Sequence, residues 1–90
     1  MFMISELDLR AREQMEQIGR RISALRGIKR ISQEVLAERA KISSVELSLI
    51  ESPAVYNVFS MEVFYNICTA LEISPSALIS GEIVVDGEVK

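Results

Sequence analysis

Histidine is absent from this chain of 90 residues, and cysteine occurs once, at Cys68. Without histidine the chain lacks the side chain most used for general acid and base catalysis near neutral pH, which is also the commonest metal ligand. Glycine-rich phosphate loops, serine–lysine pairs three residues apart and Gly-Xaa-Ser-Xaa-Gly elbows are missing as well. These absences predict a protein that is not an enzyme and that binds no metal or small-molecule cofactor.

Long apolar runs are also missing. The longest, Met1 to Ile4, is far shorter than the roughly 20 residues that span a bilayer. No basic start leads into an apolar stretch, and a single cysteine cannot form an intramolecular disulfide. We therefore expect a cytoplasmic protein that is neither exported nor inserted in a membrane.

Proline and glycine are scarce, with two and four residues, while 49% of the chain is apolar and 26% is charged. This composition is typical of a compact globule, and the length suits one small domain. We expect an N-terminal extension with the start of a helix over residues 1–17, the main domain over 18–80 and a tail over 81–90.

The net charge of −3 disfavours nucleic-acid binding until the charges are placed along the chain. The segment from Gln17 to Gln33 contains five cations and no acid, whereas the segments before and after it are acidic on balance. Such a run can be a solvated helix face, or it can contact phosphates. The five cations are Arg20, Arg21, Arg26, Lys29 and Arg30.

Apolar residues spaced by three and four predict a first helix that begins near residue 5 or 8 and ends near residue 25 or 27. Its apolar stripe consists of Ala11, Met15, Ile18, Ile22 and Leu25. Ser32 predicts the start of a second, short helix that ends near residue 40 or 41. Ser43 and Glu46 form a capping box for a third helix, which Pro53 ends.

Ser60 predicts the cap of a fourth helix over residues 61–72, and Pro75 after Ser74 predicts the start of a last helix through residues 78 and 79. The expected fold class is therefore all-α, with five helices. Residues 83–85, the Asp86-Gly87 pair and Val89 predict in addition a short C-terminal strand or hairpin. That tail would pack on the bundle, pair with the same segment of a second subunit, or be disordered.

Residues 33–51 read QEVLAERAKISSVELSLIE and resemble the helix-turn-helix of lambda-repressor-like transcriptional regulators of the Cro/CI (XRE) type. The similarity extends over about residues 18–79, because residues 18–22 resemble the first helix of that family and residues 60–62 and 70–74 resemble its fourth helix and the following turn. The resemblance implies a five-helix lambda-repressor-like DNA-binding domain. In this architecture the second helix crosses the DNA backbone and the third enters the major groove.

The resemblance also implies a role for individual residues. Base contacts are implied in the third helix at Ser43, Ser44, Val45, Ser48 and Leu49. Phosphate contacts are implied near the ends of the helices that flank the groove, and the candidates are Gln33, Arg20, Arg21, Lys29, Arg30, Lys41 and Ser52. A structural ion pair is implied between Arg26, late in the first helix, and Glu51, at the end of the third.

The predicted third helix departs from that family in its groove-facing residues. Residues 43–52 contain no Arg, Lys, Gln or Asn, which form the bidentate contacts with guanine and adenine. Serine bonds to several bases, Val45 or Leu49 could touch a thymine methyl group, and Glu46 could accept from cytosine. Specificity would depend partly on DNA shape. Lys41 stands where the family usually has glycine, so it must adopt or avoid a left-handed conformation at about 1 kcal/mol.

The apolar residues of the termini and of the segment after the third helix exceed what five short helices need. They predict self-association, with a monomer that covers them itself as the alternative. The candidate dimer interface consists of Val55, Tyr56, Ile79, Ile83 and Val85.

The sequence as a whole predicts a small transcriptional regulator of a bacterium or its phage, which binds double-stranded operator DNA as a homodimer without a cofactor. Cro-like repressors, restriction–modification controllers and antitoxins all fit this description. The alternative is an adaptor or anti-regulator that keeps the helix-turn-helix fold, binds DNA weakly and acts through a protein partner. The acids of the third helix motivate it, because acids facing phosphates repel them.

Overall fold

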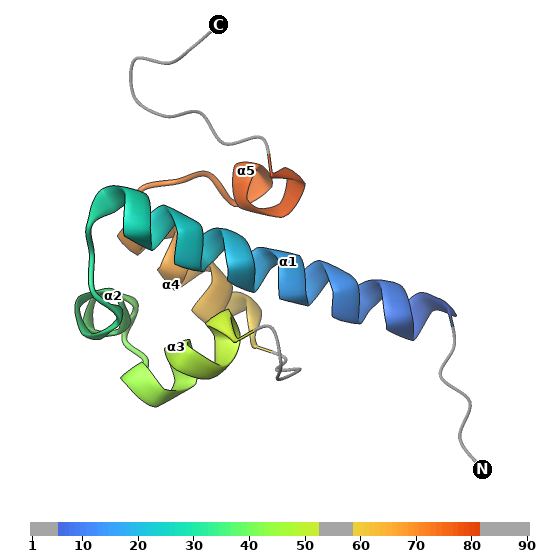
Figure 1. Cartoon of the computed structure of the whole chain (residues 1–90), viewed down its shortest axis with the longest axis horizontal. Helices are drawn as coiled ribbons and strands as arrows, with labels where there is room; N and C mark the ends of the chain where they lie inside the picture. Colours follow the sequence, from blue (N-terminus) through green and yellow to red (C-terminus); the bar gives the residue numbers. More distant parts are fainter. Residues whose placement is uncertain (1–5, 53–58, 82–90) are drawn as a thin grey trace, which may run out of the picture.

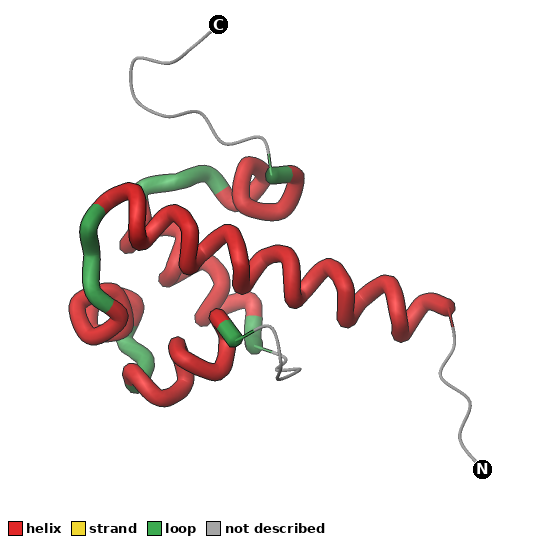
Figure 2. Tube along the Cα trace, viewed as in Figure 1, coloured by secondary structure: helices red, strands yellow, loops and turns green. Residues whose placement is uncertain are grey.

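The computed structural model describes residues 6–52 and 59–81 of the chain. They form five α-helices (Figures 1 and 2), which are α1 (Glu6–Lys29), α2 (Gln33–Ala40), α3 (Ser44–Glu51), α4 (Met61–Leu71) and α5 (Pro75–Ser80). The all-α fold class is confirmed, and the expected C-terminal strand or hairpin lies outside the described residues. None of the described helices is long and apolar enough to cross a membrane.

The long helix α1 is the axis around which the other helices are arranged. α3 and α5 pack on opposite sides of it, and α2 packs against α4 (Figure 1). All five helices contribute to one apolar core, whose burial is the main term that stabilises the domain. The core residues are Ile18, Ile22, Leu25, Leu36, Ala37, Ala40, Leu47, Ile50, Phe64, Ile67, Cys68, Leu71 and Leu78.

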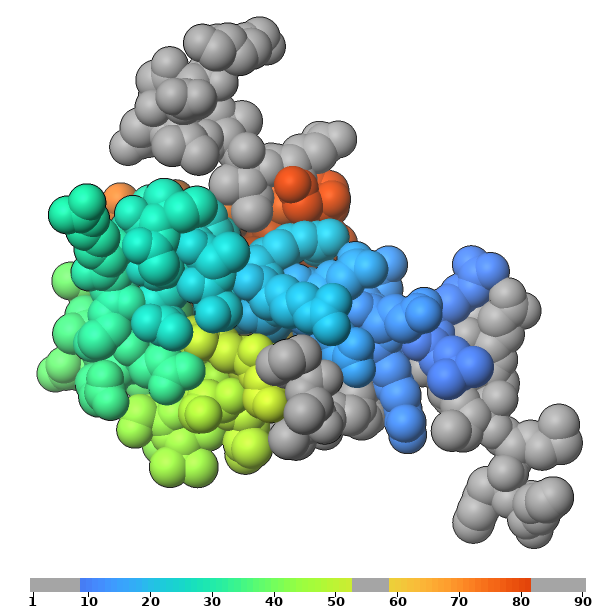
Figure 3. All heavy atoms as spheres, viewed as in Figure 1, coloured from blue at the N-terminus to red at the C-terminus, as the bar shows by residue number. Residues whose placement is uncertain are grey.

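The N-terminal part of α1 extends beyond the bundle, and Figure 3 shows its blue end projecting past the other helices. Ile22 and Leu25 are accordingly buried, Met15 is half-buried, and Ala11 is exposed. The predicted apolar stripe is therefore buried only where the other helices cover it, and Ala11 lies beyond them. A helical period shows which residues share a face, but not how far the neighbouring helices reach along it.

Each of the helices α2 to α5 begins at a serine cap. Four serine hydroxyl oxygens accept a hydrogen bond from the backbone N–H three residues later, at 3.0–3.1 Å. The capping serines are Ser32, Ser43, Ser60 and Ser74. All four predicted helix starts are confirmed, because a cap is a local signal that short stretches of sequence carry.

The end of α1 differs from the prediction, since the helix continues through Gly27 to Lys29. A glycine within a helix lowers stability but does not by itself end the helix. The helix closes where the backbone N–H of Ile31 bonds to the carbonyl oxygen of Arg26 at 3.0 Å. α3 ends as expected, because Ser52, directly before the proline, has an extended backbone with ψ of 124°.

Three helices end in a left-handed residue that is not glycine. Arg30, Lys41 and Glu72 follow α1, α2 and α4 with φ of 58°, 61° and 58°. Lys41 thus adopts the conformation that costs a residue with a Cβ about 1 kcal/mol. The turn between α2 and α3 keeps a regular helix-ending bond, from the N–H of Ile42 to the carbonyl oxygen of Ala37 at 3.0 Å.

Cys68 lies in the core on α4, with 2% of its surface exposed. Burial raises the pKa of its thiol above the ordinary value, because the thiolate would lose its hydration. The thiol therefore stays neutral and acts as a small apolar core residue, as its place on the stripe of Phe64 and Leu71 predicts.

Candidate nucleic-acid interface

Helix α3 has one buried face and one exposed face. Leu47 and Ile50 belong to the core, whereas a continuous strip of small and aliphatic residues faces solvent. The exposed residues are Ser44, Val45, Ser48 and Leu49, which the sequence predicts as base contacts. Val45 is 69% exposed and Leu49 is 40% exposed, so both aliphatic side chains are available to a partner.

The buried face of α3 lies unusually close to α1 at Gly19. A Cβ atom built on Gly19 would lie 3.2 Å from the carbonyl carbon of Ile50 and closer still to its oxygen, inside the distance of any real contact. The absence of a side chain therefore permits the two backbones to approach. This contact determines how far α3 stands from α1, and hence where its exposed face lies.

The carboxylate of Glu51 joins three elements at the end of α3. It accepts two parallel hydrogen bonds from Arg26 of α1, through Nε and Nη2, each of 2.9 Å. It also accepts a bond of 2.9 Å from Nε2 of Gln33, the first residue of α2. Nη1 of Arg26 donates to the carbonyl oxygen of Ile31 in the α1–α2 turn at 3.0 Å. The network therefore connects α1, the turn, α2 and α3.

Charge and burial make this network sensitive to the loss of either partner. The Glu51 side chain is 5% exposed and that of Arg26 is 20% exposed. The hydrogen bond with Glu51 raises the pKa of Arg26 above its ordinary value; burial opposes this, and the charges of Glu51 and Glu34 add to it. The guanidinium thus stays charged, and a bidentate pair of this kind holds both geometry and charge in place.

Arg21 is bound at α5 rather than available at the surface of α3. Its Nη1 donates to the carbonyl oxygens of Leu78 and Ile79 at 2.9 and 2.6 Å, and its Nη2 donates to Gln17 Oε1 at 3.1 Å. Carbonyls in the last turn of a helix lack partners within the helix, so the guanidinium caps α5. α5 and α3 lie on opposite sides of α1 (Figure 1). The structure therefore places the guanidinium of Arg21 at the end of α5, away from α3.

Lys29 and Arg30 line a pocket of about 410 Å³ at the C-terminal end of α1. Arg39 of α2 and residues 70–72 at the end of α4 line it as well, and among the described residues none from α3 does. The pocket therefore combines three cations with one acid, Glu72. These cations share this pocket with the end of α4.

The other predicted phosphate contacts lie near α3. Two of them flank it along the chain, and two lie on α1 and α2 where these helices contact it. Lys41 is exposed in the turn before α3, and Ser52 is half-buried directly after it. Gln33 is half-buried and bound to Glu51, which places the first turn of α2 beside the end of α3. Arg20 is exposed on α1, next to the glycine that packs on Ile50.

The predicted dimer interface is described at one residue, because Val55, Tyr56, Ile83 and Val85 lie outside the described residues. Ile79 is 48% exposed and lines an apolar pocket of about 120 Å³. The pocket is formed by α1, α4, α5 and Phe59, and its residues are Met15, Ile18, Phe59, Met61, Phe64 and Ile79. This side of the domain therefore exposes apolar surface.

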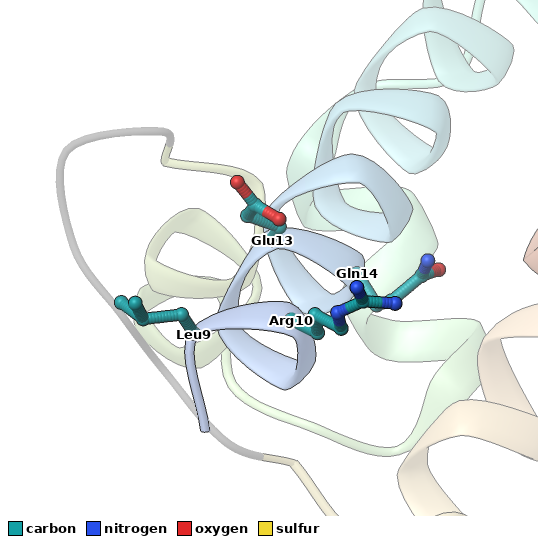
Figure 4. A pocket seen from close by; sticks show the side chains of 4 residues that line it. All are labelled: Leu9, Arg10, Glu13 and Gln14. Atoms are coloured by element: carbon teal, nitrogen blue, oxygen red, sulfur yellow. The ribbon is translucent and has the colours of Figure 1, made fainter. Parts of the chain in front are cut away.

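A third hollow, of about 470 Å³, lies along the projecting part of α1. Among the described residues its lining comes from one helix turn, with Leu9, Arg10, Glu13 and Gln14. Figure 4 shows Leu9 leaving one side of the helix while Arg10 and Gln14 leave the other. These side chains do not converge, so we assign no binding site to this hollow.

A family model described as a helix-turn-helix domain matches residues 19–84. The chain belongs to this helix-turn-helix family. The resemblance drawn from residues 33–51 is thus confirmed at the level of the family, and membership of it supports a role in DNA-binding transcription regulation.

The helix-turn-helix fold is also that of a crystal structure of the clp gene regulator ClgR from C. glutamicum. The two chains are 24% identical and superpose with a TM-score of 0.66, over 81% of this chain and 96% of the regulator. No curated protein matches the chain. The likeness to ClgR establishes the fold.

Three residues position the helix-turn-helix, and a fourth positions α5, without having been predicted to do so. They are Gly19 under α3, Arg21 at α5, Gln33 on Glu51, and Asn66, whose Nδ2 on α4 donates to the carbonyl oxygen of Ala40 at 3.3 Å. The signal at Gly19 is an isolated glycine within a helical pattern, which can indicate a close packing contact. The other three make contacts between distant elements and give no local signal.

Proposed function

We propose that the chain binds operator DNA as a homodimer and regulates transcription from it, with α3 in the major groove. Ser43, Ser44, Val45, Ser48 and Leu49 would then lie against the base edges. The observation that carries this proposal is the asymmetry of α3. Its buried face is fixed to α1 and α2 by the Gly19 contact and the Glu51 network, while its other face exposes four residues to solvent.

Phosphate contacts in this proposal come from the residues that surround α3. Lys41 in the turn before α3, Ser52 after it, Gln33 at the start of α2 and Arg20 on α1 are the four we retain. The N-terminus of α2 adds the positive end of a helix dipole, which favours phosphate. We leave Arg21, Lys29 and Arg30 outside this set because their surroundings belong to α5 and α4.

A homodimer fits the two-fold symmetry that regulators of this architecture share with their operators. The apolar pocket beside Ile79 supports self-association, because exposed apolar surface of this kind is covered in stable assemblies. A dimer presents two α3 helices to two half-sites, and each half-site adds its own phosphate and base contacts.

Titration of the protein onto the DNA upstream of its own gene, and onto a scrambled duplex, tests the proposal at several salt concentrations. We expect binding to the upstream DNA to be tighter by about a thousandfold or more, with two chains per duplex and with affinity that falls steeply as salt rises. Equal and weak binding to both duplexes at low salt would contradict the proposal. It would favour an adaptor that uses the aliphatic face of α3 for a protein partner.

Replacing Lys41 by alanine is expected to weaken binding to all duplexes alike and to lower the salt dependence by about one counterion for each half-site. Alanine keeps a Cβ at the left-handed position, so the free energy of unfolding should change little. The control is Arg39→Ala, which removes the same charge from the last turn of α2 at the pocket beside α4. A changed sequence preference, or an equal effect of both substitutions, would rule out a phosphate contact by Lys41.

A further inference from the structure

The chemistry of the exposed face of α3 limits what it can recognise in DNA. Its four exposed residues are two serines and two aliphatic residues, and residues 43–52 contain no Arg, Lys, Asn or Gln. Those absent side chains read guanine and adenine through paired hydrogen bonds. Serine hydroxyls donate or accept and therefore tolerate several bases. Of these four residues, the two aliphatic ones are then those that can discriminate between base pairs.

Val45 and Leu49 stand four positions apart, so they occupy neighbouring places on one side of α3. Their exposed fractions of 69% and 40% leave methyl groups available on the helix surface. In the major groove, the apolar group that a base pair presents is the C5-methyl of thymine, which also distinguishes A·T from T·A. An aliphatic side chain and a thymine methyl both lose hydration when they meet, which favours the contact.

We propose that this regulator reads its operator mainly through the methyl groups of thymines, which Val45 and Leu49 contact in each half-site. This inference rests on the proposed function, since it names the feature of DNA that the same surface recognises. Ser44 and Ser48 then bond to whichever base edges lie beside those thymines. Recognition of guanine by paired hydrogen bonds from α3 plays no part.

The composition of this face favours DNA over a protein as its partner. The residues that dominate protein–protein binding are mainly Trp, Tyr and Arg, while Val, Leu and Ser are under-represented among them. The face of α3 contains Val45, Leu49 and serines, with no aromatic residue. The aliphatic part of this face consists of two side chains, Val45 and Leu49, with Ser44 and Ser48 beside them.

The test compares the upstream DNA with the same fragment amplified with deoxyuridine triphosphate in place of thymidine triphosphate. Uracil pairs with adenine as thymine does and lacks only the C5-methyl group. We expect the uracil duplex to bind more weakly by about tenfold or more. Each methyl taken out of water contributes roughly a factor of four to the affinity, and the factors of the two half-sites multiply. Both duplexes should keep a steep dependence on salt, since the phosphates are unchanged.

The protein variant Val45→Ala/Leu49→Ala separates a methyl contact from a change in DNA shape. In this variant the thymine-to-uracil ratio should fall towards one, because the side chains that detect the methyl groups are gone. The control Ile28→Ala truncates an aliphatic residue that is 57% exposed on α1 and should retain the full ratio. Circular dichroism of each variant establishes that it is folded before the comparison is made.

Each outcome decides between the inference and the function on which it rests. Tight, salt-dependent binding that is equal for the thymine and uracil duplexes would overturn thymine-methyl recognition while leaving operator binding intact. A ratio that persists unchanged in the double variant would also overturn it, since the effect would then arise from DNA shape. Weak binding to upstream, scrambled and uracil duplexes alike at low salt would overturn operator binding itself.

Discussion

Replacing Gly19 by alanine is expected to lower the free energy of unfolding by about 3 kcal/mol, which corresponds to a fall of roughly 15 °C in Tm. The new Cβ would meet the backbone of Ile50, and a backbone carbonyl cannot rotate away as a side chain can. The domain must therefore separate α1 from α3, which opens the core on both sides of the contact. Thermal unfolding followed by circular dichroism measures the effect.

Gly27→Ala is the matched control, because Gly27 lies in the same helix and a Cβ there meets nothing within 4 Å. That substitution should raise the free energy of unfolding by about 0.5–1 kcal/mol, since alanine has the higher helix propensity. Opposite signs for the same chemical change would locate the cost at the α1–α3 contact. Equal stabilisation by both substitutions would show that α3 does not approach α1 as closely as described.

Removing one partner of the Arg26–Glu51 pair should also have a large effect. We expect Arg26→Met to destabilise the domain by about 3 kcal/mol. The Glu51 carboxylate would stay buried without its opposite charge, and would keep the hydrogen bond from Gln33. Glu51→Leu should cost a similar amount, since the partly buried guanidinium loses its two bonds to the carboxylate. Urea unfolding of each variant gives the free energies.

The double variant Arg26→Met/Glu51→Leu is expected to be more stable than either single variant. Once both charges are gone, neither member of the pair leaves the other as an unpaired buried charge, and the Met and Leu side chains that replace them can pack. The double-mutant cycle then gives the coupling energy of the pair. Additive losses in the double variant would mean that the two residues stabilise the domain independently, contrary to the bonds between them.

The sequence predicted the helix starts but did not indicate the partners of Arg21. Serine caps such as Ser43 act over three residues, so they can be recognised in a short stretch. Arg21 lies in the basic segment, and its charge pattern suggested phosphate contact. Its actual acceptors lie 57 and 58 residues further along the chain, where no local pattern indicates them.

Some of the predicted site residues lie together as the sequence predicts. Arg26 and Glu51 meet, and Ser44, Val45, Ser48 and Leu49 share one exposed face of α3. The third member of the network was unforeseen, because a glutamine at the start of a helix resembles a surface residue in sequence. The close approach at Gly19 was also unforeseen, since it depends on the distance between two helices and not on the residues of either one.

α5 is the last of the described helices to be synthesised. It contributes Leu78 to the core and accepts two hydrogen bonds from Arg21 of α1. Until α5 has emerged from the ribosome, the surface of α1 that it covers stays in water, and the nascent chain is an incomplete bundle with exposed apolar residues. The bundle is therefore complete only after α5 has been synthesised. Truncations that remove α5 should leave a chain prone to aggregation and dependent on chaperones rather than a smaller DNA-binding unit.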